Sequence, residues 1–172
     1  TAIEQDQNRL EECEQNNALL TLIGLEQELH TTEEIQGLDF PVRFYGFADR
    51  IDRIGNAIFI LDYKTGYIEP KELKVADVAS IFEIPDNTKA FQVLFYAWVY
   101  AKKAGVPKEG LTAGIFSTRS PSNKFMSLSI NSNTSITLEV LEVFQERLFK
   151  MIQELFDATI PFAQRLTTIK DT

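Results

Sequence analysis

The stretch from Gly46 to Gly66 reads GFADRIDRIGNAIFILDYKTG and decides the fold that we predict. Residues 42–54 and 57–64 contain many β-branched and aromatic residues, which favour strands. Gly55-Asn56 lies between them and is a typical two-residue turn. The stretch therefore predicts a β-hairpin with a tight loop.

The register of this hairpin brings acidic residues together. A two-residue loop pairs the strand ends on either side of it, and counting outward from them places Asp49 opposite Asp62. Their Cβ atoms are then expected to lie roughly 4.5–5.5 Å apart. Lys64 follows Asp62 by two residues and so points from the same face of the sheet.

Two opposed carboxylates repel each other unless a positive charge lies between them. Lys64 can supply part of that charge, and a hard divalent cation would supply more, since Mg²⁺ favours carboxylate oxygens together with waters and phosphates. Asp52 lies three residues from Asp49, so we assign it to the opposite face and to a structural role beside Arg50 and Arg53. A β-bulge would exchange these faces.

The runs 46–52 and 61–66 closely resemble the RecB-like nucleases of the PD-(D/E)xK superfamily, which carry G-x-x-D on one strand and D-x-K-[ST] on the next. These nucleases also carry Gln and Tyr four residues apart on a downstream helix, where this chain has Gln92 and Tyr96. Taken alone, residues 62–66 would also fit a strand that ends in a solvated ion pair.

The resemblance implies a role for each residue of the site. A carboxylate-held Mg²⁺ or Mn²⁺ would activate water and bind phosphate oxygens, while Lys64 would orient that water or stabilise the transition state. Gln92 and Tyr96 would hydrogen-bond the phosphate, the water or Lys64, although the same spacing also fits a helix that packs its tyrosine on the sheet. Glu26 is the first choice for a third acid on the preceding strand, and Glu28 is the alternate. The implied catalytic residues are Asp49, Asp62, Lys64, Gln92 and Tyr96, and the implied metal ligands are Glu26, Asp49, Asp62 and the Tyr63 carbonyl.

Periodicity along the rest of the chain, together with the hairpin, predicts the order helix, three strands, helix, two strands, helix. Together with the resemblance it predicts a mixed α/β fold, of the α+β type with a mixed sheet, in which a central mixed β-sheet of a restriction-endonuclease-like core is flanked by helices. Residues 67–87 have no clear period and are expected to hold a short helix or a flap. Helices are expected over 2–20, 88–105 and 137–158, and further strands over 22–35, 111–118 and 125–130.

Composition limits the surroundings in which the chain can act. It has 172 residues and a net charge of −8, which counts against a stand-alone nucleic-acid binder, so the basic surface is either local or supplied by another domain. One cysteine excludes an internal disulfide and a cysteine-built cluster within the chain. We expect a single nuclease domain over 1–172, with its core in 22–165, that is part of a longer bacterial cytoplasmic protein and does not bind membranes.

The leading hypothesis is a Mg²⁺- or Mn²⁺-dependent DNA nuclease of recombination and repair, an exonuclease by resemblance. Its expected partners are DNA and a helicase domain or subunit, in cis or in trans. The alternative is a catalytically inactive domain that binds DNA ends or braces a helicase–nuclease complex, which the acidic composition favours. A phosphohydrolase of small molecules is a third reading, supported only by generic acidic residues.

Overall fold

The predicted hairpin forms the centre of the structure. In the computed structural model, which describes residues 2–108, 110–119 and 125–161, β2 (Val42–Ile54) and β3 (Ala57–Lys64) pair antiparallel. Ile54 faces Ala57 across the loop, and Gly55 takes a positive φ of 59°. This conformation favours glycine, and the predicted register is confirmed.

Three more strands extend the hairpin into a mixed sheet. The long strand β1 (Leu20–Glu33) pairs antiparallel with β2, β5 (Leu111–Ser117) pairs parallel with β3, and β6 (Met126–Ser127) pairs antiparallel with β5. The resulting order is β1-β2-β3-β5-β6. A parallel pair needs a crossover connection, and the chain between β3 and β5 supplies it with a helix.

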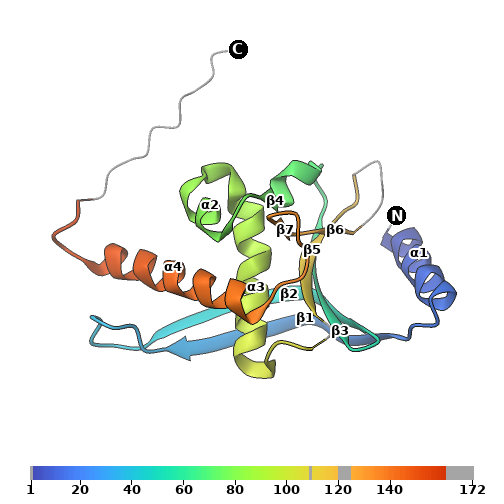
Figure 1. Ribbon diagram of the computed structural model, residues 1–172, viewed down its shortest axis with the longest axis horizontal. Helices are drawn as coiled ribbons and strands as arrows, with labels where there is room; N and C mark the ends of the chain where they lie inside the picture. The colour runs from blue at the N-terminus through green and yellow to red at the C-terminus, as the bar shows by residue number, and fades with distance from the viewer. Residues whose placement is uncertain (1, 109, 120–124, 162–172) are drawn as a thin grey trace, which may run out of the picture.

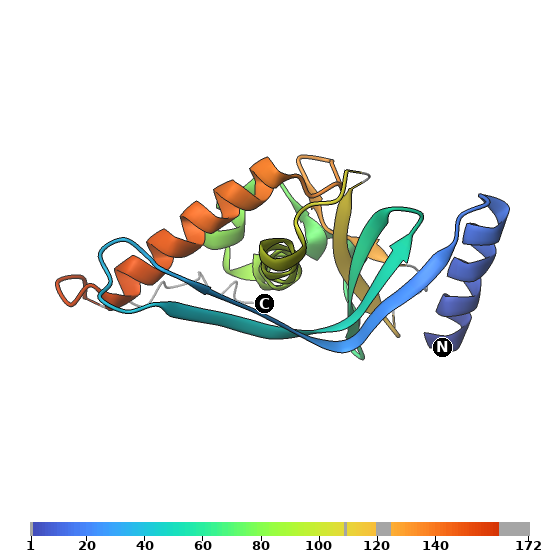
Figure 2. The same ribbon diagram turned by 90° about the horizontal axis from the view of Figure 1, so that it is seen from below.

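That crossover helix is α3 (Thr88–Ala104), which runs across one face of the sheet (Figure 1). It follows Asn87 and ends at Gly105, as predicted, and Gly105 has a φ of 76°. Viewed from below, α3 appears end-on between the β1–β2 ribbon and α4 (Leu138–Phe156) (Figure 2). The expected mixed sheet flanked by helices is therefore confirmed.

Helix α4 covers α3 with an apolar stripe. Leu141, Phe144 and Leu148 lie three and four residues apart, and each is at most 3% exposed. The side chain of Thr137 accepts a hydrogen bond from the Val140 backbone and so caps the helix where the sequence predicted its start. The core of the molecule thus lies between α3, α4 and the sheet.

The segment before α3 is packed against the core instead of forming a free flap. It consists of short pieces: η1 (Pro70–Leu73), β4 (Lys74–Val75), α2 (Val78–Glu83) and η2 (Pro85–Asn87). Leu73 is fully buried, and β4 pairs with β7 (Ser129–Ile130). Elements this short cannot show a period in the sequence, which is why the pattern there was unclear.

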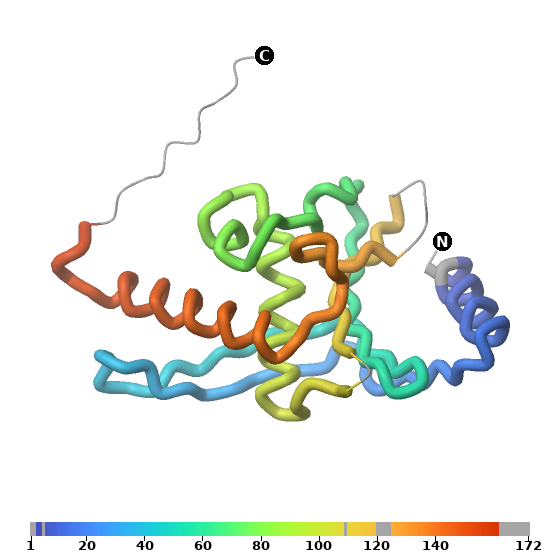
Figure 3. Tube along the Cα trace, in the orientation of Figure 1, coloured from blue at the N-terminus to red at the C-terminus, as the bar shows by residue number. Residues whose placement is uncertain are grey.

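Helix α1 (Ala2–Gln15) stands apart from the other helices, at the opposite end of the molecule from α4 (Figure 3). It is shorter than the helix predicted over 2–20, because β1 already begins at Leu20. Within the part of the chain that the structure describes, no helix is both long and apolar enough to cross a membrane.

The packing of α4 predicts the effect of truncating Phe144. Its ring contacts Phe82, Phe91 and Trp98, so Phe144→Ala would leave a cavity and lower the free energy of unfolding by about 3–5 kcal/mol. Urea denaturation measures this change. Val143→Ala is the matched control, since Val143 is 39% exposed on the same helix; equal losses in both variants would contradict the packing described here.

Candidate active site

The β2–β3 ladder stops where the predicted acids begin. Backbone pairing runs from the loop to Arg50 and Leu61, so the next facing positions are Asp49 and Asp62. Asp49 Oδ2 accepts the backbone N–H of Tyr63 at 2.6 Å. A side-chain carboxylate thus takes the place that a backbone carbonyl of β2 would occupy in a continued ladder.

Asp62 is buried beside this break and is 4% exposed. Its Oδ1 accepts a hydrogen bond from Gln92 Nε2 at 3.1 Å, and its Oδ2 lies 2.9 Å from Lys64 Nζ. Apart from this ion pair, Oδ2 has no hydrogen-bond partner among the described residues. Burial raises the pKa of Asp62 above its usual range and the charge of Asp49 adds to the rise, while Lys64 opposes it.

These oxygens fit a hard divalent cation. Lys64 brings one positive charge to two neighbouring carboxylates, one of them buried, and a divalent cation would balance the negative charge that remains. In a strand, the N–H and C=O of one residue point toward the same neighbour. Since the N–H of Tyr63 points at Asp49, its carbonyl is directed to the same side.

Glu26 lies opposite Asp49 in the β1–β2 register, between the pairs Leu25–Arg50 and Gln27–Ala48. Its φ is 45°, an unusual value for a non-glycine residue, and its side chain is exposed. Over the residues with described positions, no three acidic, histidine or cysteine side chains gather closely enough to hold a metal ion. The structure therefore brings two carboxylates together, and Glu26 as a third ligand stays a prediction.

The alternate acid, Glu28, has other partners. Its carboxylate lies 3.1 Å from the Arg43 guanidinium and 3.6 Å from His30 Nδ1. Its position in β1 faces Phe47, two residues before Asp49. These contacts fit a surface ion pair.

Helix α3 places Gln92 against Asp62 and Tyr96 against Gln92. The four-residue spacing places both on one helical face, and Gln92 Nε2 donates to Tyr96 Oη at 3.0 Å as well as to Asp62. Gln92 therefore orients a carboxylate, which is a role that the spacing alone did not indicate.

Gly46 explains why the strand can approach this helix. A Cβ atom added at Gly46 would lie 2.8 Å from Cε1 of Tyr96, closer than such atoms pack. The glycine of the G-x-x-D run is thus required by contact with the tyrosine of the downstream helix. Tyr96 packs on the sheet at Gly46, which fits the packing interpretation of the helix, and it also accepts a hydrogen bond from Gln92. A role of the two side chains toward phosphate, water or Lys64 stays a prediction.

The alternation of β2 is interrupted at the site. Gly46 and Ile51 both lie on the α3 side, Gly46 against Tyr96 and Ile51 in a hollow shared with Val99, although a regular strand would place them on opposite faces. The irregularity coincides with the positive φ of Glu26. Because of this irregularity, the Asp49 side chain points at the β3 backbone. In a regular strand it would project from the face of the sheet.

Asp52 lies on the face away from α3 and has a structural environment, as predicted. It is fully buried, with Oδ1 2.8 Å from Arg50 Nε and Oδ2 2.5 Å from Arg9 Nη1. Arg50 was expected as a partner, whereas Arg9 of α1 takes the place expected for Arg53. No local sequence signal connects two residues that are 43 positions apart.

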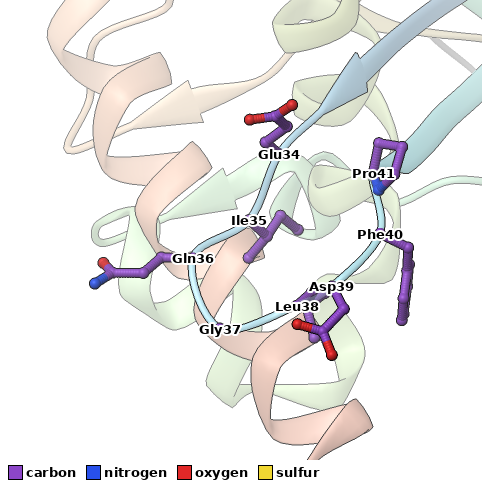
Figure 4. Close-up of a pocket in the computed structure, with 8 residues that line it drawn as sticks. All are labelled: Glu34, Ile35, Gln36, Gly37, Leu38, Asp39, Phe40 and Pro41. Atoms are coloured by element: carbon purple, nitrogen blue, oxygen red, sulfur yellow. The ribbon is translucent and has the colours of Figure 1, made fainter.

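A separate hollow of about 460 Å³ lies under the β1–β2 loop and is lined by the consecutive residues 34–41 (Figure 4). The loop is attached to α4, since Gln153 Nε2 donates to the Gln36 carbonyl and the rings of Phe40 and Phe156 meet edge to face. It is at the end of the ribbon remote from Asp49 and contributes nothing to the site.

Comparison with known proteins identifies one family. The family model described as the PD-(D/E)XK nuclease superfamily matches residues 3–166, a span that contains every residue of the site. No curated protein and no solved structure matches the chain significantly.

The contact between Gly46 and Tyr96 predicts a coupled pair of substitutions. Gly46→Ala is expected to lower the free energy of unfolding by about 1–3 kcal/mol, as overpacking does. In a Tyr96→Ala background the same change should cost much less, because the obstructing ring is absent. Urea denaturation of the two single variants and the double variant measures the coupling; additive losses would contradict the contact.

The buried charge of Asp62 predicts a stabilising substitution. Asp62→Asn keeps the acceptor for Gln92 and removes a carboxylate whose ionised form the fold disfavours, so the variant should melt at a higher temperature than the wild type in EDTA. Differential scanning calorimetry measures the shift. Asp39→Asn, at an exposed acid, is the control and should leave the midpoint unchanged; a lower midpoint for Asp62→Asn would overturn the argument.

Proposed function

Because the chain belongs to the PD-(D/E)XK nuclease superfamily, we propose that it is a Mg²⁺- or Mn²⁺-dependent deoxyribonuclease whose active site is formed by Asp49, Asp62, Lys64, Gln92 and Tyr96. One observation carries the proposal. The buried Oδ2 of Asp62 has Lys64 as its partner and no other among the described residues, and it lies at the point where Asp49 interrupts the ladder.

Asp49, Asp62 and the carbonyl of Tyr63 would hold the metal, with Glu26 as a further or water-bridged ligand. When bound, a divalent ion lowers the pKa of a coordinated water and neutralises charge on phosphate oxygens. The chain contributes an arrangement fixed before the ion arrives. Asp49 is held by the Tyr63 N–H, and Asp62 is held by Gln92.

Lys64 is the cation of the site. Its side chain is about one-third exposed and its Nζ lies 2.9 Å from Asp62 Oδ2, so it can reach both the carboxylate and an approaching phosphate. We assign it to orienting the attacking water and stabilising negative charge in the transition state.

Gln92 and Tyr96 contribute to the site from helix α3 and act on different oxygens. Gln92 orients Asp62, and Tyr96 accepts a hydrogen bond from Gln92, which leaves its own hydroxyl proton available to a phosphate oxygen. This division of roles is more specific than the sequence suggested.

The resemblance to RecB-like nucleases supports an exonuclease that acts in bacterial DNA recombination and repair, in the cytoplasm. The net charge of −8 supports a further part of the assembly, a helicase domain or subunit, that supplies affinity for DNA. We propose residues 1–172 as one nuclease domain within such an assembly.

The acidic composition also favours a second candidate, a domain that binds DNA ends or braces a helicase–nuclease complex without cleaving. The two candidates differ in what the site does with metal. The buried carboxylate of Asp62 destabilises the folded state, and a domain that does not cleave DNA would gain no function in return.

Cleavage of end-labelled single- and double-stranded DNA in Mg²⁺, Mn²⁺ or EDTA tests the proposal. The wild type should cleave only with metal, and Lys64→Ala should reduce the rate by about 10²–10³-fold, the typical loss on removing one charge-stabilising donor. Lys74→Ala, at an exposed lysine of β4, should cleave like the wild type. Unchanged cleavage by Lys64→Ala would refute the assigned site, and DNA binding without cleavage by the wild type would favour the second candidate.

A further inference from the structure

A network of charged side chains lies behind the catalytic hairpin, on the face away from α3. Its centre is Arg50, the residue after Asp49. The Arg50 guanidinium donates to Asp52 Oδ1 at 2.8 Å, to Asp6 Oδ1 at 2.5 Å and to the Tyr63 hydroxyl at 3.4 Å. It is 12% exposed, so these partners replace most of its water.

Arg50 completes the fixation of Tyr63, the residue between Asp62 and Lys64. The Tyr63 backbone N–H is bound by Asp49, its hydroxyl by Arg50, and its ring stacks on Phe116 with the centroids 5.6 Å apart. Tyr63 is bonded along the backbone to Asp62 and Lys64. Holding Tyr63 from three directions therefore also fixes the backbone positions from which the side chains of Asp62 and Lys64 extend.

Helix α1 covers this network on its outer side and contributes Asp6 and Arg9 to it. Arg9 pairs with the buried Asp52, and its guanidinium lies 5.6–5.8 Å from the ring centroids of Phe59, Phe116 and Phe125. Phe116 therefore contacts both Arg9 and Tyr63. Removing Arg9 would leave the fully buried Asp52 with one cation instead of two.

Helix α1 is attached chiefly by these charges. Its apolar residues Ile3 and Leu10 are 71% and 48% exposed, and Cys13 is the buried apolar contact among its described side chains. Docking of α1 thus depends on ion pairs that involve the residue adjacent to Asp49.

We infer that Arg50 is a positioning residue of the metal site and that α1, docked through Arg9 and Asp6, holds it in place. The inference rests on the proposed function. Arg50 acts through Tyr63, whose backbone links it to both catalytic residues of β3. A helix far from α3 in the sequence and in space therefore contributes to metal affinity.

Calorimetric titration of the whole chain with Mn²⁺, without DNA, tests the inference. Tyr63→Phe removes only the hydroxyl and Arg50→Lys keeps the charge but loses the fork of donors. Both should raise the Mn²⁺ dissociation constant, near the lower end of the about 10–100-fold range for loss of an outer-shell partner. Asp6→Asn, which weakens α1 docking at a partly exposed residue, should raise it less.

Matched controls separate positioning from a general loss of structure. Tyr67→Phe and Glu11→Gln change exposed residues of the same kinds and should keep the wild-type dissociation constant. Tyr63→Phe should keep the wild-type urea midpoint and regain wild-type cleavage at saturating Mn²⁺, which a purely structural role would not produce.

Two results would overturn the inference, and they are distinguishable. Equal Mn²⁺ affinities of the wild type, Tyr63→Phe and Arg50→Lys would overturn the positioning role and leave the proposed nuclease intact. A wild type that binds no Mn²⁺ would overturn the metal site and the inference together.

Discussion

The hydrogen bond from the Tyr63 backbone N–H to the Asp49 carboxylate holds β2 and β3 in the geometry on which the rest of the candidate site depends. It ends the β2–β3 ladder after the Arg50–Leu61 pair and keeps Asp49 next to Asp62 despite their like charges. A regular ladder would have used a carbonyl here and left both carboxylates on the face of the sheet. The break therefore brings two carboxylates together where the β2–β3 ladder ends.

The crossover helix α3 adds to this geometry because β3 and β5 are parallel. A parallel pair requires a connection that returns across the sheet, and this connection brings Gln92 and Tyr96 over the break. The approach is close enough that position 46 has no room for a side chain. The parallel pairing of β3 and β5 thus accounts for the position of α3. The position of α3 in turn explains why residue 46 is a glycine and why Gln92 can orient Asp62.

Much of this site was predictable from local pattern, and the rest depends on contacts between distant residues. The Gly55-Asn56 turn fixed the register and so placed Asp49 opposite Asp62, while the four-residue spacing gave the face of α3. The partnership of Arg9 with Asp52 joins two residues that are 43 positions apart, and no periodicity indicates it. The positive φ of Glu26 is equally invisible in the sequence, because glutamate rarely adopts it.

The most direct test of the central claim is to locate a bound divalent ion by NMR, using the paramagnetic broadening that Mn²⁺ causes in nearby amide signals. The account predicts that the first signals to broaden at low Mn²⁺ are those of Asp49, Asp62, Tyr63 and Lys64. It also predicts that Mg²⁺ in excess restores them. Early broadening on the acidic surface of α1, with the β2–β3 break unaffected, would contradict the assignment of the metal site.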